Sequence, residues 1–315
     1  MLNQYEVPVA LSVWAVNNEY TGSNEDKSIS ATTLLKSVRQ ILLSRRASTN
    51  SEEDVIDKID AAVGTAIHSA IEHAWTNNYK ENLKVLGYSD KTINAIKINP
   101  TEVHDGDIPV YLEQRIEKKV LDWTVTGQFD MVFNGQLIDF KTTGTYTYET
   151  KCKDNDYILQ GSIYRWLSPL ITEDTIAINF IFKNWTESKV MDPKYPKAKV
   201  LEYSLPLKSQ MEVTTFILDK LQRLNKYYDA EEKDLPNCTD EELALKPSIF
   251  AYYSNSTATG RATKLFDNST AAYSYLREKG KGVVKERKGS PVTCKYCKGC
   301  QLCSQYRAFK EQGLL

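Results

Sequence analysis

The sequence predicts an α/β fold, with a central mixed β-sheet flanked by helices and a small cysteine-rich extension at the C-terminal end. Apolar residues recur at steps of three and four over 54–77 and 209–228, which indicates two long amphipathic helices. Between them, the stretches 110–142 and 175–205 alternate apolar and polar residues or form short apolar runs, as strands do. The apolar content, 41% of 315 residues, is enough to build a hydrophobic core.

The other elements follow in chain order. Residues 1–25 are expected to be extended or irregular, and 28–46 to form a basic amphipathic helix that opens with residues typical of helix caps. A short helix is expected near 91–97, and Asn134-Gly135 is a strong signal for a hairpin turn. The expected strands are 110–120, 124–133, 136–142, 175–184 and 200–205, and the remaining helices are 156–167, 209–228 and 269–279.

Composition restricts the class of protein. Lysine and arginine number 40 against 41 for aspartate and glutamate, so a net charge of −1 excludes bulk attraction to nucleic acid but permits a local basic groove. No apolar run reaches the roughly 18 residues of a membrane helix, and the first residues lack the pattern of a signal peptide. We expect a cytoplasmic protein (in the host cytoplasm if phage-encoded), where cysteines serve as metal ligands or free thiols more often than as disulfides.

Two acids and a lysine form the central candidate site. Asp139 and Lys141 lie two residues apart on one strand, so their side chains point to the same face, and the hairpin brings Asp130 beside them. Converging carboxylates suit Mg²⁺ or Mn²⁺, and a neighbouring ammonium can orient a water or stabilise charge on a phosphate. These parts can hydrolyse a phosphodiester. The alternative is a solvated, salt-bridged strand face.

Two helices carry further candidates. His68 and Glu72 share a face of the 54–77 helix because they are four residues apart, and the same spacing puts Gln160 and Tyr164 on one face of the 156–167 helix. Taken alone, each pair could equally be structural, a satisfied histidine in the first case and helix packing in the second.

In order along the chain, these residues resemble a known family. The patterns G-x-x-x-H-x-x-x-E at 64–72, G-x-x-D at 127–130, D-x-K at 139–141 and Q-x-x-x-Y at 160–164 are similar to those of the PD-(D/E)XK nuclease superfamily. The closest resemblance is to its RecB-like branch, which includes phage exonucleases and CRISPR-associated adaptation exonucleases. It covers roughly residues 28–310 and implies a restriction-endonuclease-like core. Two features depart from the pattern: no proline precedes Asp130, and the second acid is Asp139 rather than glutamate.

The resemblance also implies roles for individual residues. Asp130, Asp139, the Phe140 carbonyl and His68 would bind Mg²⁺ or Mn²⁺, and Lys141 would position or activate the attacking water. Gln160 and Tyr164 would support the site or touch the DNA strand, with Glu72 on the histidine helix as a further supporting residue. Glu113 or Glu117 could supply an additional carboxylate, although either could be a solvated strand residue.

The C-terminal segment contains four cysteines within ten residues, which predicts a structural zinc or iron–sulfur site rather than reduced surface thiols. One alternative uses all four. The other follows the RecB-like branch, in which a distant cysteine joins three C-terminal ones, and we slightly favour it because four consecutive C-x2-C steps would crowd one ion. The ligands would then be Cys238, Cys294, Cys297 and Cys303, with Cys300 spare. Zinc and a [4Fe-4S] cluster both remain open.

The resulting expectation is a nuclease core over 1–234, with an N-terminal helical part, and a cysteine-rich module over 235–315. Between Arg277 and Lys298, eight basic residues against two acidic ones give +6, and together with the basic helix at 36–46 they could flank a DNA groove. Five tyrosines could stack on the bases of a single strand or simply pack a small module: Tyr252, Tyr253, Tyr273, Tyr275 and Tyr296.

The expected function is a metal-dependent DNA nuclease, an exonuclease in phage or mobile-element replication, recombination or DNA processing. Its partners would be single-stranded DNA or duplex ends, with recombination or replication proteins alongside and no membrane. A non-catalytic nucleic-acid-binding or assembly protein with the same fold and a structure-specific endonuclease are the alternatives.

Overall fold

The computed structural model describes residues 1–17, 26–47, 53–255, 257 and 260–315. It contains two compact units. The first comprises Met1–Leu35 and Glu52–Gln222, and the second comprises Lys36–Ser51 and Arg223–Leu315. The domain boundary predicted at residue 235 therefore falls inside the second unit. Within the described residues, no helix is both long enough and apolar enough to cross a membrane.

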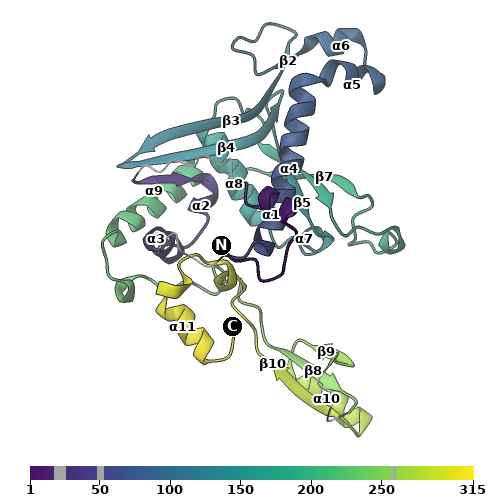
Figure 1. The fold of residues 1–315 in the computed structure, drawn as a ribbon, viewed down its shortest axis with the longest axis vertical. Coiled ribbons are helices and arrows are strands. Elements are labelled where there is room, and N and C mark those ends of the chain that lie inside the picture. The colour runs from purple at the N-terminus through teal and green to yellow at the C-terminus, as the bar shows by residue number, and fades with distance from the viewer. Residues whose placement is uncertain (18–25, 48–52, 256, 258–259) are drawn as a thin grey trace. The chain divides into compact units, whose positions relative to one another are not determined.

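A seven-stranded mixed sheet forms the centre of the first unit, with helices flanking it (Figure 1). The strand order is β2-β3-β4-β5-β6-β7, and β1 pairs with β4 outside this path. The β1–β4, β2–β3 and β5–β6 pairs are parallel, whereas β3–β4, β4–β5 and β6–β7 are antiparallel. The strands are β1 (Ser28–Ser30), β2 (Ile96–Ile98), β3 (Ile108–Val120), β4 (Trp123–Phe133), β5 (Gln136–Thr143), β6 (Thr175–Phe182) and β7 (Val200–Pro206). The predicted mixed α/β class is confirmed.

Helices α4, α6 and α8 correspond to predicted helices, whereas α1, α5 and α7 were not predicted. Leu83 and Ile93 pack on Val110 and Leu112 of β3 in one core cluster. The helices are α1 (Val9–Ala15), α2 (Ala31–Leu34), α4 (Ile56–Asn77), α5 (Tyr79–Val85), α6 (Asp90–Ala95), α7 (Thr145–Thr150) and α8 (Asp154–Leu167), with a short 3-10 turn η1 (Glu187–Lys189). Helix α9 (Gln210–Tyr227) begins in this unit and ends in the second.

Two predictions near the N-terminus were wrong. The expected single helix over 28–46 is instead strand β1, the short helix α2 and helix α3 (Val38–Arg46). The chain is interrupted because Ser30 and Ser37 are N-caps: each accepts a hydrogen bond from the backbone N–H three residues on, and Ser37 forms a capping box with Gln40. Residues 1–25 were expected to be irregular, but α1 lies within them. Residues 18–25 lie outside the described part.

The second unit consists of α3, the end of α9, a small sheet and a cysteine-containing segment. The sheet is three-stranded and antiparallel, in the order β10-β8-β9. Its elements are β8 (Ile249–Tyr253), β9 (Lys264–Phe266), α10 (Ser269–Lys279) and β10 (Val283–Arg287). The others are the 3-10 turns η2 (Glu232–Asp234), η3 (Val292–Tyr296) and η4 (Cys300–Leu302), and helix α11 (Ser304–Glu311).

Candidate functional site

The candidate site lies where strands β4 and β5 separate. Their ladder runs from Phe133↔Gln136 to Met131↔Ile138 and stops there, so the next opposed residues, Asp130 and Asp139, do not pair. Instead, the Asp130 carboxylate accepts a hydrogen bond of 2.8 Å from the backbone N–H of Phe140. A side chain thus replaces a strand contact at this point and satisfies the exposed backbone donor. The separation places the Asp130 carboxylate between the two strands.

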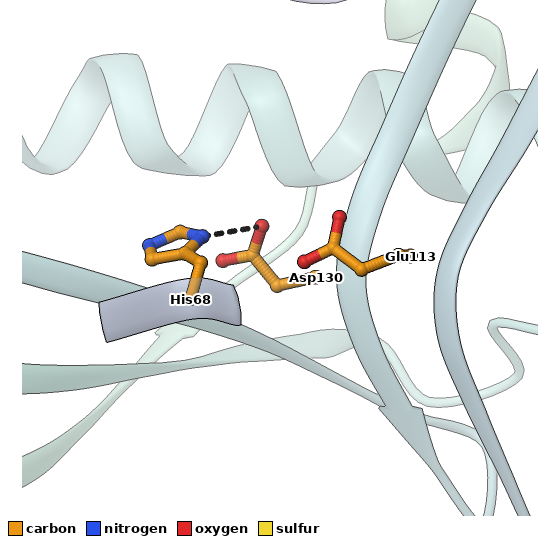
Figure 2. A group of neighbouring side chains, drawn as sticks. All are labelled: His68, Glu113 and Asp130. Atoms are coloured by element: carbon orange, nitrogen blue, oxygen red, sulfur yellow. Dashed lines mark ion pairs between the residues drawn. The ribbon is translucent and has the colours of Figure 1, made fainter. Parts of the chain in front are cut away.

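Three side chains from different elements meet at this point: His68 of α4, Glu113 of β3 and Asp130 of β4 (Figure 2). One ligand atom of each lies within 4.8 Å of the others, and this is the only such set of three His, Cys, Asp or Glu residues in the described part of the chain. His68 Nδ1 is 3.4 Å from Asp130 Oδ1, and His68 Nε2 is 2.9 Å from the Phe140 carbonyl oxygen. The structure thus brings the predicted histidine, acid and carbonyl together.

Glu113, not Glu117, joins this group. Its φ of +47° is in the left-handed region, which a non-glycine residue in a strand rarely adopts. Leu112 and Gln114 pair with β4 on either side of Glu113, but Glu113 does not pair with Asp130, the residue opposite it. Its carboxylate accepts a hydrogen bond of 2.9 Å from Gln128. Such backbone outliers are concentrated at functional sites. Glu117 is exposed, and it pairs with Thr126 in the ladder.

Asp139 and Lys141 form an ion pair beside the group. The predicted common face is present: Lys141 Nζ lies 2.5 Å from Asp139 Oδ2, and the Asp139 side chain is 4% exposed. Burial raises the pKa of Asp139 to about 6, since the charge of Lys141 only partly offsets the cost of desolvation. Burial alone would lower the pKa of Lys141, but the charges of Asp139 and Asp130 more than compensate and raise it. Lys141 therefore stays a cation at neutral pH.

Electrostatics in the three-residue group favour protonation in the metal-free state. Burial and the charge of Asp130 raise the pKa of Glu113 to about 7, and the nearby charge of Glu72 acts in the same direction. The hydrogen bond and charge of Asp130 raise the pKa of His68 despite partial burial. Both His68 nitrogens face acceptors, as the protonated imidazolium requires. A cation would relieve this excess of carboxylates.

The predicted supporting residues Gln160 and Tyr164 both lie on α8. Gln160 donates a hydrogen bond of 2.9 Å to the Tyr164 hydroxyl, and Tyr164 is buried. A Cβ at Gly127 would lie 3.0 Å from the Tyr164 ring, so a larger residue there would force this ring to shift by a few tenths of an ångström. This contact accounts for the glycine in the G-x-x-D pattern. Gly64 has no such role, because a Cβ there would meet nothing within 4 Å.

The donor set fits a hard or borderline divalent cation. Two carboxylates and one imidazole are ligand types that Mg²⁺ or Mn²⁺ accepts, with Mn²⁺ tolerating the imidazole better. The Phe140 carbonyl faces the other ring nitrogen of His68 from the one that faces Asp130. Three ligand atoms within 4.8 Å of one another span a distance that one ion can bridge with small side-chain adjustments. Asp139 is not part of this set, since its carboxylate is paired with Lys141.

In the second unit, five cysteines surround one pocket. Its lining includes Cys238, Cys294, Cys297, Cys300 and Cys303, all of them free thiols, together with Arg39, Gln40 and Leu43 of α3. Burial raises the pKa of Cys294 to about 11, and each of the other four sulfurs is near enough to raise it further. Burial also raises the pKa of Cys238 and of Cys297. The distant Cys238 thus joins the C-terminal cysteines, as one sequence alternative required, and Cys300 lines the pocket as well.

Arg39 anchors this pocket. Its side chain is 2% exposed, and its Nε donates to the Cys303 sulfur at 3.2 Å. The guanidinium also pairs with Glu232 and donates to the Leu235 carbonyl at 3.0 Å and the Ser304 hydroxyl at 2.9 Å. The sequence suggested that the basic helix containing Arg39 could contact DNA. For Arg39 this is wrong, because the side chain is buried among these partners.

The predicted stacking tyrosines divide into two classes. Tyr252 and Tyr253 are buried and Tyr275 contacts Tyr252 ring to edge, so these three pack the small sheet and its helix. Tyr273 and Tyr296 are exposed, at 49% and 82%. Of the five, Tyr273 and Tyr296 present the most ring surface to solvent, and therefore to a base.

No family model and no curated protein matches the sequence. Among solved structures, the chain is similar to SSO0001 with 12% identity and a TM-score of 0.43, covering 69% of this chain and 87% of that one. It is also similar to a phage-related exonuclease from Haemophilus somnus 129PT with 15% identity and a TM-score of 0.29, covering 64% of this chain and 93% of that one. Both TM-scores are below 0.5, so neither likeness supports a functional assignment.

Proposed function

We propose that this protein is a metal-dependent hydrolase of phosphodiester bonds in DNA. The observation that carries the proposal is the convergence of His68, Glu113 and Asp130, from three separate elements, beside a buried Asp139–Lys141 ion pair. A solvated strand face would not place one acid at 4% exposure with a lysine held against it. The arrangement is the one expected for positioning a phosphate, a water and a cation together.

His68, Glu113 and Asp130 would hold the cation, with the Phe140 carbonyl beside them. When bound, a divalent cation would polarise a phosphate oxygen and lower the pKa of a water. Asp130 has two tasks, because one of its oxygens accepts from the Phe140 N–H while the other faces His68. The backbone contact fixes the orientation of the carboxylate before any ligand arrives.

Lys141 would stabilise negative charge on the phosphate and orient the attacking water. It cannot take a proton from that water while it remains an ammonium, and its raised pKa keeps it in that form. Asp139 holds the ammonium in place. The Asp139 carboxylate would become an additional metal ligand, as the family resemblance implies, only if the ion pair opens.

The finer assignment follows the sequence resemblance to the RecB-like branch of the PD-(D/E)XK nucleases. On that basis we propose an exonuclease that acts on single-stranded DNA or duplex ends in phage or mobile-element replication, recombination or processing. Gln160 and Tyr164, packed against Gly127, would support the strand that carries Asp130.

The test is cleavage of end-labelled linear DNA by the whole protein with Mg²⁺ or Mn²⁺. Asp130→Asn and Lys141→Met should each reduce the rate by at least about 10²-fold, because the first weakens binding of the cation and the second removes the ammonium that stabilises charge on the phosphate. Glu117→Gln is the matched control, since Glu117 is on the strand of Glu113 but outside the group, and should keep wild-type activity. Circular single-stranded DNA should resist an exonuclease. Unchanged cleavage by either active-site variant contradicts the proposal, and binding without cleavage by the wild-type protein would favour a non-catalytic DNA-binding protein.

We further propose that the cysteine pocket holds a structural iron–sulfur cluster. Five cysteines line one pocket, which is enough thiolate for a cluster or for zinc. The choice of the cluster follows the sequence resemblance to the RecB-like branch.

Metal and sulfide analysis of anaerobically purified protein, with a visible spectrum, decides between the two. Cys303→Ser should lose the metal, whereas Cys152→Ser, which changes an exposed thiol outside the pocket, should keep it. Retention in Cys300→Ser would identify Cys300 as the spare residue. Stoichiometric zinc without iron in the wild-type protein would contradict the cluster.

A further inference from the structure

The segment 247–289 is an insertion within the second unit. The chain enters and leaves it at adjacent points: the Lys246 N–H donates to the Ser290 carbonyl at 3.2 Å, and Leu245 and Pro291 form an isolated antiparallel bridge. Gly289 sits so close to the Lys246 carbonyl that a Cβ there would approach it to 1.6 Å. Since its ends are joined this tightly, the insertion can be removed without separating Cys238 from the later cysteines.

The insertion has a core of its own. Tyr252 of β8, Ala272 of α10 and Val284 of β10 form a buried cluster, and half-buried apolar residues of β9 and α10 pack around it. Figure 1 shows β8, β9, β10 and α10 together as one small α/β element. The Tyr252 hydroxyl donates to the Lys281 carbonyl at 2.9 Å, which closes the loop between α10 and β10. We call residues 246–288, which comprise this segment up to Lys288 and the adjoining Lys246, the basic module.

The basic module concentrates positive charge. It contains nine basic residues and three acidic ones, a net charge of +6, whereas the chain as a whole carries −1 and the remaining residues therefore carry −7. All nine basic side chains are exposed. They are Lys246, Arg261, Lys264, Arg277, Lys279, Lys281, Lys285, Arg287 and Lys288. A surface of this kind attracts polyanions that the rest of the protein would repel.

Two tyrosines hold four of these cations in place. Lys285 Nζ is 5.3 Å from the centre of the Tyr253 ring, and Arg287 donates to the Tyr253 hydroxyl at 2.6 Å. On the helix side, Lys264 and Lys279 lie 4.6 Å and 5.1 Å from the centre of the Tyr275 ring. Cations held by a ring lose less conformational freedom on binding a phosphate than freely moving ones do.

We propose that the basic module binds the phosphate backbone of DNA, without reading base sequence, and tethers the substrate to a protein whose other residues repel it. The choice of DNA among polyanions rests on the proposed function, while the binding itself does not require catalysis. Lysines on the edge strand β10 could also serve to discourage pairing with other chains. That purpose would not need the cations of β9, α10 and the α10–β10 loop.

The test measures DNA binding in the Asp130→Asn background without divalent cations, so that cleavage does not enter. Anisotropy of a labelled duplex is recorded from 50 to 200 mM KCl, with poly-glutamate as a competing acidic polypeptide. Replacing Lys264, Lys279, Lys285 and Arg287 by glutamine should lower the slope of log affinity against log salt by about 3–4, since each phosphate contact contributes about 0.9. Replacing 247–289 by a short glycine–serine link should lower it at least as much.

The matched control replaces four exposed lysines of the first unit by glutamine: Lys151, Lys153, Lys189 and Lys194. The slope of log affinity against log salt should change by less than about 0.9, the contribution of one phosphate contact. The proposal is overturned if the control and the module variant weaken binding equally, or if the module variant binds DNA as the wild type does. It is also overturned if poly-glutamate displaces duplex DNA at equal charge concentration. A protein that cleaves DNA but shows any of these three results would retain its proposed function and lose only this inference.

Discussion

Cation binding at the His68–Glu113–Asp130 group should strengthen steeply between about pH 5.5 and pH 8. Each ligand must be deprotonated to bind, and burial together with the charge of Asp130 raises the pKa of Glu113 to about 7. With that pKa, roughly 3% of Glu113 is ionised at pH 5.5 and about 90% at pH 8, a difference of about 30-fold in apparent affinity from this residue alone. The raised pKa of His68 acts in the same direction.

Isothermal titration of Mn²⁺ into metal-free protein measures this directly. Glu113→Gln should bind more weakly at pH 8 and lose most of the pH dependence, whereas Glu117→Gln should behave as the wild type. An affinity that is equal at both pH values would refute the reasoning, because it would mean that Glu113 is not a ligand or is not perturbed.

The same pKa values predict how the stability of the metal-free protein changes with pH. Asp139 and Glu113 have folded-state pKa values of about 6 and about 7, above those of the unfolded chain. The folded state therefore binds protons more tightly than the unfolded chain does. The contribution of these two residues to the free energy of unfolding is complete at low pH and declines as the pH rises from about 4 through 7. The thermal midpoint of the metal-free protein should fall over this range, and Mn²⁺ should reverse the fall. A midpoint that rises with pH in both states would contradict the assignment.

Two further substitutions test the packing. Gly127→Ala should lower the free energy of unfolding by about 1–3 kcal/mol, because the added methyl meets the Tyr164 ring at 3.0 Å. The control Gly64→Ala, which adds a methyl in open space on a helix, should be neutral or stabilising by up to about 1 kcal/mol. Equal urea midpoints for the two variants would contradict the close approach of Gly127 to Tyr164. Arg39→Gln should cost about 1–3 kcal/mol, because it removes the donor to the buried Leu235 carbonyl and the cation beside the half-buried Glu232. Arg46→Gln, on the exposed end of the same helix, should cost less than about 1 kcal/mol. A similarly small loss in both variants would show that the Arg39 contacts are not formed.

Much of the fold could be predicted because its signals are local. The hairpin turn at Asn134-Gly135 is present, with φ values of +47° and +87°. Both lie in the positive-φ region that asparagine and glycine adopt more readily than other residues do. Helix α10 begins and ends at the predicted residues, 269 and 279. The long helix α4 and the strands β4 to β7 lie within two residues of the predictions. The prediction of one helix over 28–46 was wrong because Ser30 and Ser37 each begin a new helix. The sequence alone does not distinguish a serine that caps a helix from one inside it.

By itself, the sequence determined the mixed α/β class, the order of the main strands and helices from β3 to α9, and the common face of Asp139 and Lys141. All of these follow from the period of a helix or a strand. The tertiary structure decided which residues from distant elements meet. It selected Glu113 over Glu117 through a left-handed backbone conformation that no periodic pattern encodes. It also buried Arg39 against Cys303 rather than exposing it on a basic helix. These outcomes depend on strand separation, register and packing between elements, and a one-dimensional pattern does not contain those distances.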